Sequence, residues 1–262
     1  MSNIIDTIKQ SMWLSTKETL SNVIMIANRE LDIELLSSRV GKPLANTRTV
    51  EMRGNTAIIP VIGTIVRYSS MFTDICGAVS TEILAKDFTE AMNNPIVKNI
   101  VFKFDTGGGE AKGIAELSDM IYEARNTKKI IAYVGDECAS GGYWLASACS
   151  EIHGSKMAMV GSIGAVLTIR QSEEDNGIEI VSNVSPYKRP DFNTDEGLAV
   201  VQSHVDKFGE IFVDSVAINR GQSSQYILDN FGKGGIIVGQ DAVNSGMLDS
   251  LTNFEDLLKK LD

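Results

Sequence analysis

Histidine is almost missing from this chain, which has only two, His153 and His204, among its 262 residues. Neither lies in a stretch typical of a metal site or of a catalytic triad. A Ser-His-Asp hydrolase would have to use one of these two rings as its base. A serine nucleophile in this chain is therefore expected to use a different base, and neither a metal nor a cofactor is expected.

Cysteine is also scarce. The chain has three cysteines, Cys76, Cys138 and Cys149, and no two of them form a CxxC pair. An odd number of cysteines without a secretory signal indicates reduced thiols and excludes a disulfide framework as the basis of the fold.

Long apolar runs and clustered positive charge are missing as well. No segment reaches the roughly 18 uncharged apolar residues of a membrane span, and Lys9, Lys17 and Glu18 interrupt any signal-peptide core. The formal net charge of −10 argues against a nucleic-acid surface. The sequence therefore predicts a soluble, cytoplasmic protein without a membrane anchor and without a nucleic-acid partner.

The pattern of apolar residues divides the chain in two. Up to about residue 38 they recur mostly at spacings of three, four or seven, which predicts a helical arm over 1–48. Gly41-Lys-Pro43 ends this arm. The remaining residues, 49–262, are expected to form one domain.

In that domain, strand-like and helix-like segments alternate. The sequence predicts strands at Ala57–Ile62, Lys98–Phe104, Lys129–Val134, 152–153, 157–160, 166–170 and 235–238, and helices at 81–93, from Ile114, from Tyr143, at 193–219, 240–246 and 253–261. Strand, turn, helix and strand in succession indicate a mostly parallel α/β layer.

Ser140 stands at one strand-to-helix turn, in Asp136-Glu-Cys-Ala-Ser-Gly-Gly-Tyr-Trp144. A serine there can present its Oγ to a carbonyl, and the amides that open the helix can stabilise an oxyanion. Gly141 and Gly142 leave room for an approaching peptide. The same pattern fits an ordinary glycine-rich helix start equally well.

Two further glycine-rich turns are present. Gly107-Gly-Gly109 follows a strand, is predicted as a tight turn with Asp105, and matches neither the dinucleotide nor the Walker pattern. An oxyanion strip requires only an exposed amide without a side chain, which glycine provides. Gly161-Ser-Ile-Gly164 places Ser162 in a second small-residue turn, which taken alone indicates only a tight turn.

A lysine can replace histidine as the base if desolvation keeps its amine neutral. Lys188, in Val184-Ser-Pro-Tyr-Lys188, has more apolar and small neighbours than Lys207, Lys233 or Lys259-Lys260. A solvated surface lysine is the alternative interpretation.

Together these segments resemble the serine–lysine peptidases that include signal peptide peptidase A and the phage head maturation proteases. The resemblance rests on Phe104-Asp-Thr-Gly-Gly-Gly109, Ala139-Ser-Gly-Gly-Tyr-Trp144, Val160-Gly-Ser-Ile-Gly-Ala-Val166 and the position of Lys188, and it covers most of the chain. It implies a Clp protease/crotonase-like superfold built of ββα units.

The resemblance also implies roles for single residues. Ser140 would be the nucleophile, Lys188 its general base, and Ser162 would orient the lysine amine. The oxyanion hole would consist of the amide of Gly141 and that of Gly108 or Gly109.

The function implied is that of a phage or prophage head maturation protease, an oligomer in the host cytoplasm that cleaves scaffold, portal or capsid precursors. A soluble signal-peptide-peptidase-like protease is the first alternative. A crotonase-like acyl-CoA enzyme and a non-catalytic assembly protein are the others.

Overall fold

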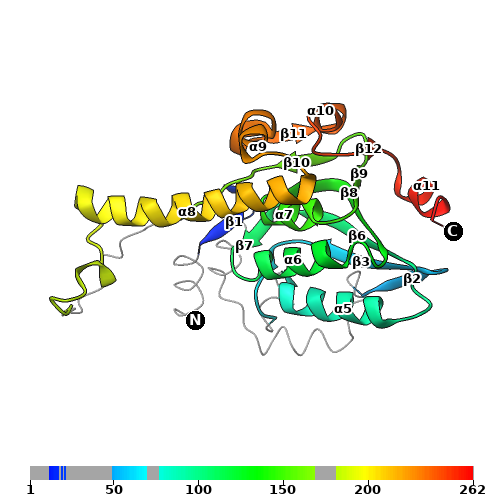
Figure 1. Ribbon diagram of the computed structural model, residues 1–262, viewed down its shortest axis with the longest axis horizontal. Helices are drawn as coiled ribbons and strands as arrows, with labels where there is room; N and C mark the ends of the chain where they lie inside the picture. Colours follow the sequence, from blue (N-terminus) through cyan, green and yellow to red (C-terminus); the bar gives the residue numbers. More distant parts are fainter. Residues whose placement is uncertain are drawn as a thin grey trace, which may run out of the picture.

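The computed structural model describes residues 12–17, 19, 21, 49–69, 77–168 and 181–261. Its strands form two sheets (Figure 1). The strands are β1 (Trp13–Ser15), β2 (Glu51–Arg53), β3 (Thr56–Ile62), β4 (Ile65–Val66), β5 (Val79–Ser80), β6 (Asn99–Thr106), β7 (Gly108–Glu110), β8 (Lys129–Ala139), β9 (Glu151–Gly154), β10 (Met159–Gly161), β11 (Ile236–Val238) and β12 (Ser250–Leu251).

The larger sheet has the order β11-β10-β8-β6-β3-β2, and β9 and β12 extend it beside β8. Its central strands β3, β6, β8 and β10 are parallel to one another. The smaller sheet has the order β1-β7-β4-β5. This arrangement confirms the mixed α/β, Clp/crotonase-like class that the sequence predicts.

Helices cover the larger sheet. They are α5 (Thr81–Asn93), α6 (Ile114–Ala124), α7 (Gly141–Ser147), α8 (Asp195–Arg220), α9 (Ser224–Asn230), α10 (Gly239–Asn244) and α11 (Phe254–Lys259), with short 3₁₀ turns η1 (Pro186–Lys188) and η2 (Gly232–Gly234). Figure 1 shows α5, α6, α7 and α8 together on one side of the sheet.

The alternation of side chains along the strands explains why both faces are apolar. Alternate residues of a strand point to opposite faces of its sheet. In β6, Ile100 and Phe102 belong to the main core cluster, whereas Val101 between them packs in a second cluster with Leu257 and Leu258 of α11. Helix α11 therefore covers the face opposite the main core.

The long helix α8 begins at Asp195, two residues later than the predicted range of 193–219. Thr194, and not Asn193, is the N-cap, and its Oγ1 accepts the amide hydrogen of Gly197 at 3.1 Å. The helix ends at Gly221, which has a left-handed backbone with φ of 63° and can adopt it without strain because it lacks a Cβ.

Two predictions of non-strand structure are wrong, and the expected strand at 166–170 shows only an isolated bridge at Val166 within its described residues. Trp13–Ser15, within the expected helical arm, is a strand paired with β7. Gly108–Glu110, which overlaps the expected tight turn, is also a strand. In both places pairing with a distant segment overrides the local pattern. Residues 1–11 and 22–48 lie outside the described residues, so the division into 1–48 and 49–262 stays a prediction.

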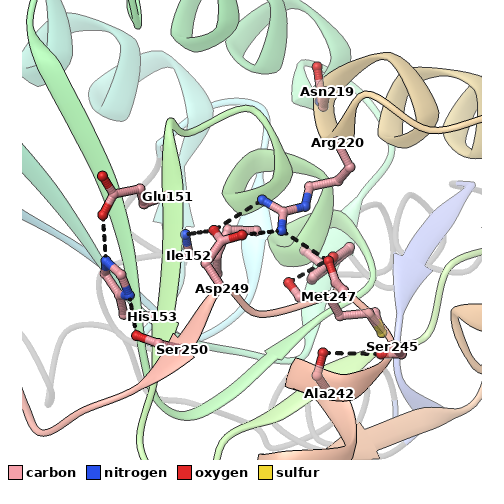
Figure 2. Close-up of polar contacts among 12 residues, drawn as sticks. Glu151, Ile152, His153, Asn219, Arg220, Ala242, Ser245, Met247, Asp249 and Ser250 are labelled. Atoms are coloured by element: carbon pink, nitrogen blue, oxygen red, sulfur yellow. Dashed lines mark hydrogen bonds and ion pairs between the residues drawn. The ribbon is translucent and has the colours of Figure 1, made fainter.

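An ion pair between a mostly buried arginine and a partly exposed aspartate joins the end of α8 to the C-terminal part of the chain (Figure 2). Nη2 of Arg220 lies 2.7 Å from Oδ1 of Asp249 and donates to the Gly246 carbonyl at 2.9 Å. Oδ2 of Asp249 also accepts the amide hydrogen of Ile152 at 2.6 Å. Since the Arg220 side chain is only 10% exposed, it depends on this carboxylate for its charge partner.

We expect Asp249→Ala to lower the free energy of unfolding by about 1–3 kcal/mol, because it leaves a mostly buried guanidinium without its charge partner. Urea unfolding followed by circular dichroism measures this difference. Glu90→Ala is the matched control, since the Lys86–Glu90 ion pair is exposed and such pairs contribute about 0–1 kcal/mol. Equal, small losses in both variants would show that the Arg220–Asp249 pair does not stabilise the fold.

Candidate active site

The predicted site residues other than Lys188 gather where three neighbouring parallel strands end. Thr106, at the end of β6, pairs with Cys138 of β8, and Ala139 at the end of β8 pairs with Gly161 of β10. The carboxyl ends of parallel strands are the usual place for a ligand in an α/β sheet. The glycine strip, Ser140 and Ser162 each follow one of these ends, so the topology brings all three together.

Ser140 itself has an unusual backbone. It lies between β8 and α7 with φ of 52° and ψ of −122°, a region that residues other than glycine rarely adopt. Its amide donates to the Gly161 carbonyl at 2.7 Å, and its carbonyl accepts the amide hydrogen of Trp144 at 3.0 Å. Strain of this kind is concentrated at functional sites, which favours the nucleophile over an ordinary helix start.

Two contacts fix the helix that follows Ser140. The ring of Trp144 stacks on that of Phe212 in α8, with centroids 4.6 Å apart and planes at 13°. The hydroxyl of Tyr143 donates to the Met247 carbonyl at 3.1 Å. Because α7 starts at Gly141, these contacts also hold the turn that carries Ser140.

The glycine strip lies directly against Ser140. A Cβ added to Gly108 would lie 2.9 Å from the Ser140 Cβ, so no side chain fits there, and the φ of +92° at Gly108 is itself a glycine conformation. A Cβ on Gly109 would strike the backbone of Ile65 in β4. Close packing on both sides therefore requires glycine at both positions.

Thr106 decides which amide of the strip is available. Its Oγ1 donates to the Gly63 carbonyl at 2.6 Å and accepts the amide hydrogen of Gly108 at 3.1 Å. The amide of Gly108 is thus already bound within the chain, which favours Gly109 over Gly108 as the oxyanion donor. The amide of Gly141, in the first turn of α7, has no acceptor within the helix.

Sequence reasoning missed this role of Thr106. The available signal was a side-chain hydroxyl directly before a glycine run, where it can bond to nearby backbone groups.

Ser162 repeats the geometry of Ser140 on the next strand. It follows β10, has φ of 55°, and donates its amide hydrogen to the Gly235 carbonyl at 2.8 Å. Besides these two serines, Lys233 is the only non-glycine residue with positive φ in the part of the chain that the structure describes.

Lys188 is not brought to this site. It is the last residue of η1, its side chain is exposed, and its amide donates to the Ser185 carbonyl at 3.1 Å. Figure 1 shows its yellow-green segment beyond the N-terminal end of α8, far from α7. Its role as base therefore stays a prediction.

Neither histidine lies where it could act as the base in place of Lys188. Nδ1 of His153 lies 2.9 Å from Oγ of Ser250, and Nε2 lies 2.8 Å from Oε2 of Glu151 (Figure 2). His153 pairs with Tyr133 in β8, seven residues before Ser140, which corresponds to about 20 Å along a strand. His204 is exposed on α8.

The cysteines near the site are poor nucleophiles. Cys138 and Cys149 are both buried, and burial raises the pKa of each thiol because it disfavours the thiolate. Over the described residues, we find no cluster of three or more histidine, cysteine, aspartate or glutamate side chains suited to a metal ion. In the same part of the chain, no helix is both long and apolar enough to cross a bilayer.

A strained serine at a strand-to-helix turn, a glycine strip against it and free amides at the helix start define a serine hydrolase site on a Clp/crotonase-like fold. Comparison with known proteins makes the class more specific. The model of peptidase family S49 matches residues 123–262. The chain belongs to this family of serine–lysine peptidases.

Two relatives of known family are similar to the chain over most of its length. The chain is 28% identical to capsid assembly protease C of Escherichia phage lambda over 219 residues, which are 80% of this chain and 49% of the relative. It is 27% identical to protease 4 of Salmonella typhi over 193 residues, which are 70% of this chain and 31% of the relative. The chain thus spans half or less of the length of these two relatives.

A solved structure resembles the fold. It is a mutant of the membrane-bound stomatin-specific protease 1510-N, with a TM-score of 0.50 and 16% sequence identity, and the match covers 80% of this chain and 86% of that one. At this identity the likeness supports the fold alone.

Proposed function

We propose that the protein is an endopeptidase with a Ser140–Lys188 dyad that cleaves structural proteins of a phage head during assembly. The observation that carries the peptidase part is the approach of the glycine strip to Ser140, with a Cβ on Gly108 only 2.9 Å from the Ser140 Cβ. The similarity to capsid assembly protease C supports the phage setting.

In the proposed reaction, a neutral Lys188 amine takes the Ser140 hydroxyl proton as Oγ attacks the carbonyl carbon of the scissile peptide bond. The amides of Gly109 and Gly141 stabilise the oxyanion that forms. The leaving amine takes the proton from the lysine and an acyl-enzyme remains. Water then hydrolyses the ester, again with the lysine as base, while Ser162 orients the amine.

The position of Lys188 indicates how the dyad would be completed. The Lys188 side chain is exposed, whereas a lysine base requires enclosure away from water. We propose that a second copy of the chain provides that enclosure, so that Ser140 of one subunit meets Lys188 of its neighbour. The expected homo-oligomer then becomes a requirement of the chemistry.

The test uses purified scaffold, portal and capsid precursors of a phage head. Each scaffold, portal and capsid precursor is incubated with the wild type, with Ser140→Ala and with Ser150→Ala, a control at an exposed serine, and new termini are read by mass spectrometry. We expect defined cuts with the wild type and the control only. Ser140-dependent cleavage of casein without cleavage of head proteins would favour the signal-peptide-peptidase-like alternative instead.

A further inference from the structure

Strand β1 lies in the groove between the glycine strip and the segment after Ser162. On one edge Leu14 pairs with Gly109 of β7. On the other edge Trp13 and Val166 exchange two backbone hydrogen bonds, each of 3.1 Å. A short segment from near the start of the sequence is therefore held as an extended strand on both edges, beside Ser140.

The register directs one carbonyl of β1 toward the proposed oxyanion donors. The amide of Thr16 donates to the Gly107 carbonyl at 2.9 Å, and that of Ala111 donates to the Met12 carbonyl at 3.0 Å. Hydrogen-bonded pairs alternate along an antiparallel ladder, so the pair between these two, Leu14 and Gly109, is also hydrogen-bonded. The Gly109 amide thus faces the Leu14 carbonyl.

The same carbonyl lies beside the nucleophile. A Cβ on Gly108 would strike the Leu14 carbonyl oxygen and would also lie 2.9 Å from the Ser140 Cβ. That oxygen is 3.4 Å from the position of a Cβ on Gly141. The Leu14 carbonyl therefore lies among Ser140 and the two residues whose amides would stabilise an oxyanion.

We propose that residues 12–16 occupy the substrate groove as a built-in substrate, and that the Leu14–Ser15 peptide bond is a self-cleavage site. The inference rests on the proposed peptidase function and adds a substrate to it. Backbone pairing with a sheet edge is a common way to recognise an extended peptide, and β1 is paired in this way on both of its edges. Leu14 is completely buried, so the groove takes an apolar side chain just before the cleaved bond.

The cleavage follows the proposed mechanism. Ser140 Oγ bonds to the Leu14 carbonyl carbon and transfers its proton to the lysine base. The bond from Leu14 to the nitrogen of Ser15 breaks, and this nitrogen takes the proton and becomes a new amino terminus. Water then adds to the acyl carbon, Ser140 regains its hydroxyl, and Leu14 ends in a carboxylate.

Occupation of the groove has a consequence for other substrates. A tethered segment competes at an effective concentration in the millimolar range. The uncut protein is therefore slow toward other peptides, and release of residues 1–14 opens the groove.

The first experiment follows the mass of the full chain during incubation. The wild type is expected to lose residues 1–14 and to gain an N-terminal Ser15, whereas Ser140→Ala stays intact. Ser15→Pro also stays intact, since proline at the leaving nitrogen resists hydrolysis, while the extended Leu14 accommodates a following proline. A synthetic peptide with the sequence Gln10–Glu18 is expected to be cut between its leucine and serine, and a version with aspartate for leucine is not.

The second experiment measures casein hydrolysis. We expect the Leu14→Asp variant to hydrolyse casein about tenfold faster than the Ser15→Pro variant. The buried aspartate expels β1 from the groove, whereas the proline variant keeps β1 there uncut. Thermal melting checks that both variants fold. If casein is cut in a Ser140-dependent way but the chain and the peptide stay whole, the self-cleavage site is refuted and the peptidase function stands. If no Ser140-dependent hydrolysis occurs at all, the peptidase function fails and the self-cleavage site with it.

Discussion

Lys188→Ala is expected to abolish peptide hydrolysis, with a loss in kcat of about 10⁴–10⁶, because nucleophile and base act as one unit. Lys188→Arg should be equally inactive, since a guanidinium stays protonated and cannot accept the serine proton. Initial rates on casein measure the loss. Lys207→Ala, at an exposed lysine of α8 paired with Glu210, is the matched control and should keep full activity.

Mixing tests whether the lysine comes from another subunit. Ser140→Ala and Lys188→Ala proteins are each inactive alone, but a mixed oligomer would contain sites with an intact serine beside an intact lysine from the neighbour. We expect activity to reappear after mixing and re-assembly. Activity of the Lys188→Ala protein alone would contradict the dyad. If the mixture has no activity, both residues of the dyad come from one chain.

Gly109→Ala is expected to lower kcat by at least the 10²–10³ that loss of one oxyanion donor causes. The new Cβ would strike the backbone of Ile65, so β7 has to shift and its amide leaves the carbonyl of the substrate. Gly209→Ala is the matched control, because a Cβ on this helical glycine meets nothing within 4 Å. Both variants are measured in two ways, by the rate of casein hydrolysis and by the rate at which a fluorophosphonate labels Ser140.

The Thr106→Val variant distinguishes a loss of activity through the oxyanion donor from a loss caused by misfolding. It keeps the shape of the side chain but removes the hydroxyl that receives the Gly108 amide. We expect a lower kcat in a protein that still folds, with a melting temperature lowered by several degrees because two hydrogen bonds of this buried side chain are lost. An unchanged kcat in both Gly109→Ala and Thr106→Val would exclude the strip from the oxyanion hole.

The sequence predicted those parts of the site that depend on neighbouring residues. Ser140 and Ser162 stand at glycine-rich turns after apolar runs, and local patterns of this kind indicate a strand end directly. Their meeting follows from parallel strand order, which βα alternation also predicts. That β10 pairs with the end of β8 is a contact between separate segments, and before the structure only the family resemblance placed Ser162 near Ser140.

Other features depend on contacts between distant residues. Trp13–Ser15 fits a helical spacing, yet its partners are Gly109 and Val166, which no local pattern reveals. The environment of the proposed base Lys188 also depends on distant contacts. The sequence around a loop lysine is the same whether its amine is solvated or enclosed by another chain.

The stack of Trp144 on Phe212 makes α8 a spacer of fixed length. Phe212 lies seventeen residues from Asp195, the first residue of the helix, which corresponds to about 25 Å at 1.5 Å per residue. One end of this rod is clamped to the helix that follows the nucleophile, and the other carries the segment with Lys188. In the proposed oligomer, the length of α8 would set the distance between Ser140 of one subunit and the body of the neighbour that provides Lys188, and one added helical turn would change that distance by about 5 Å.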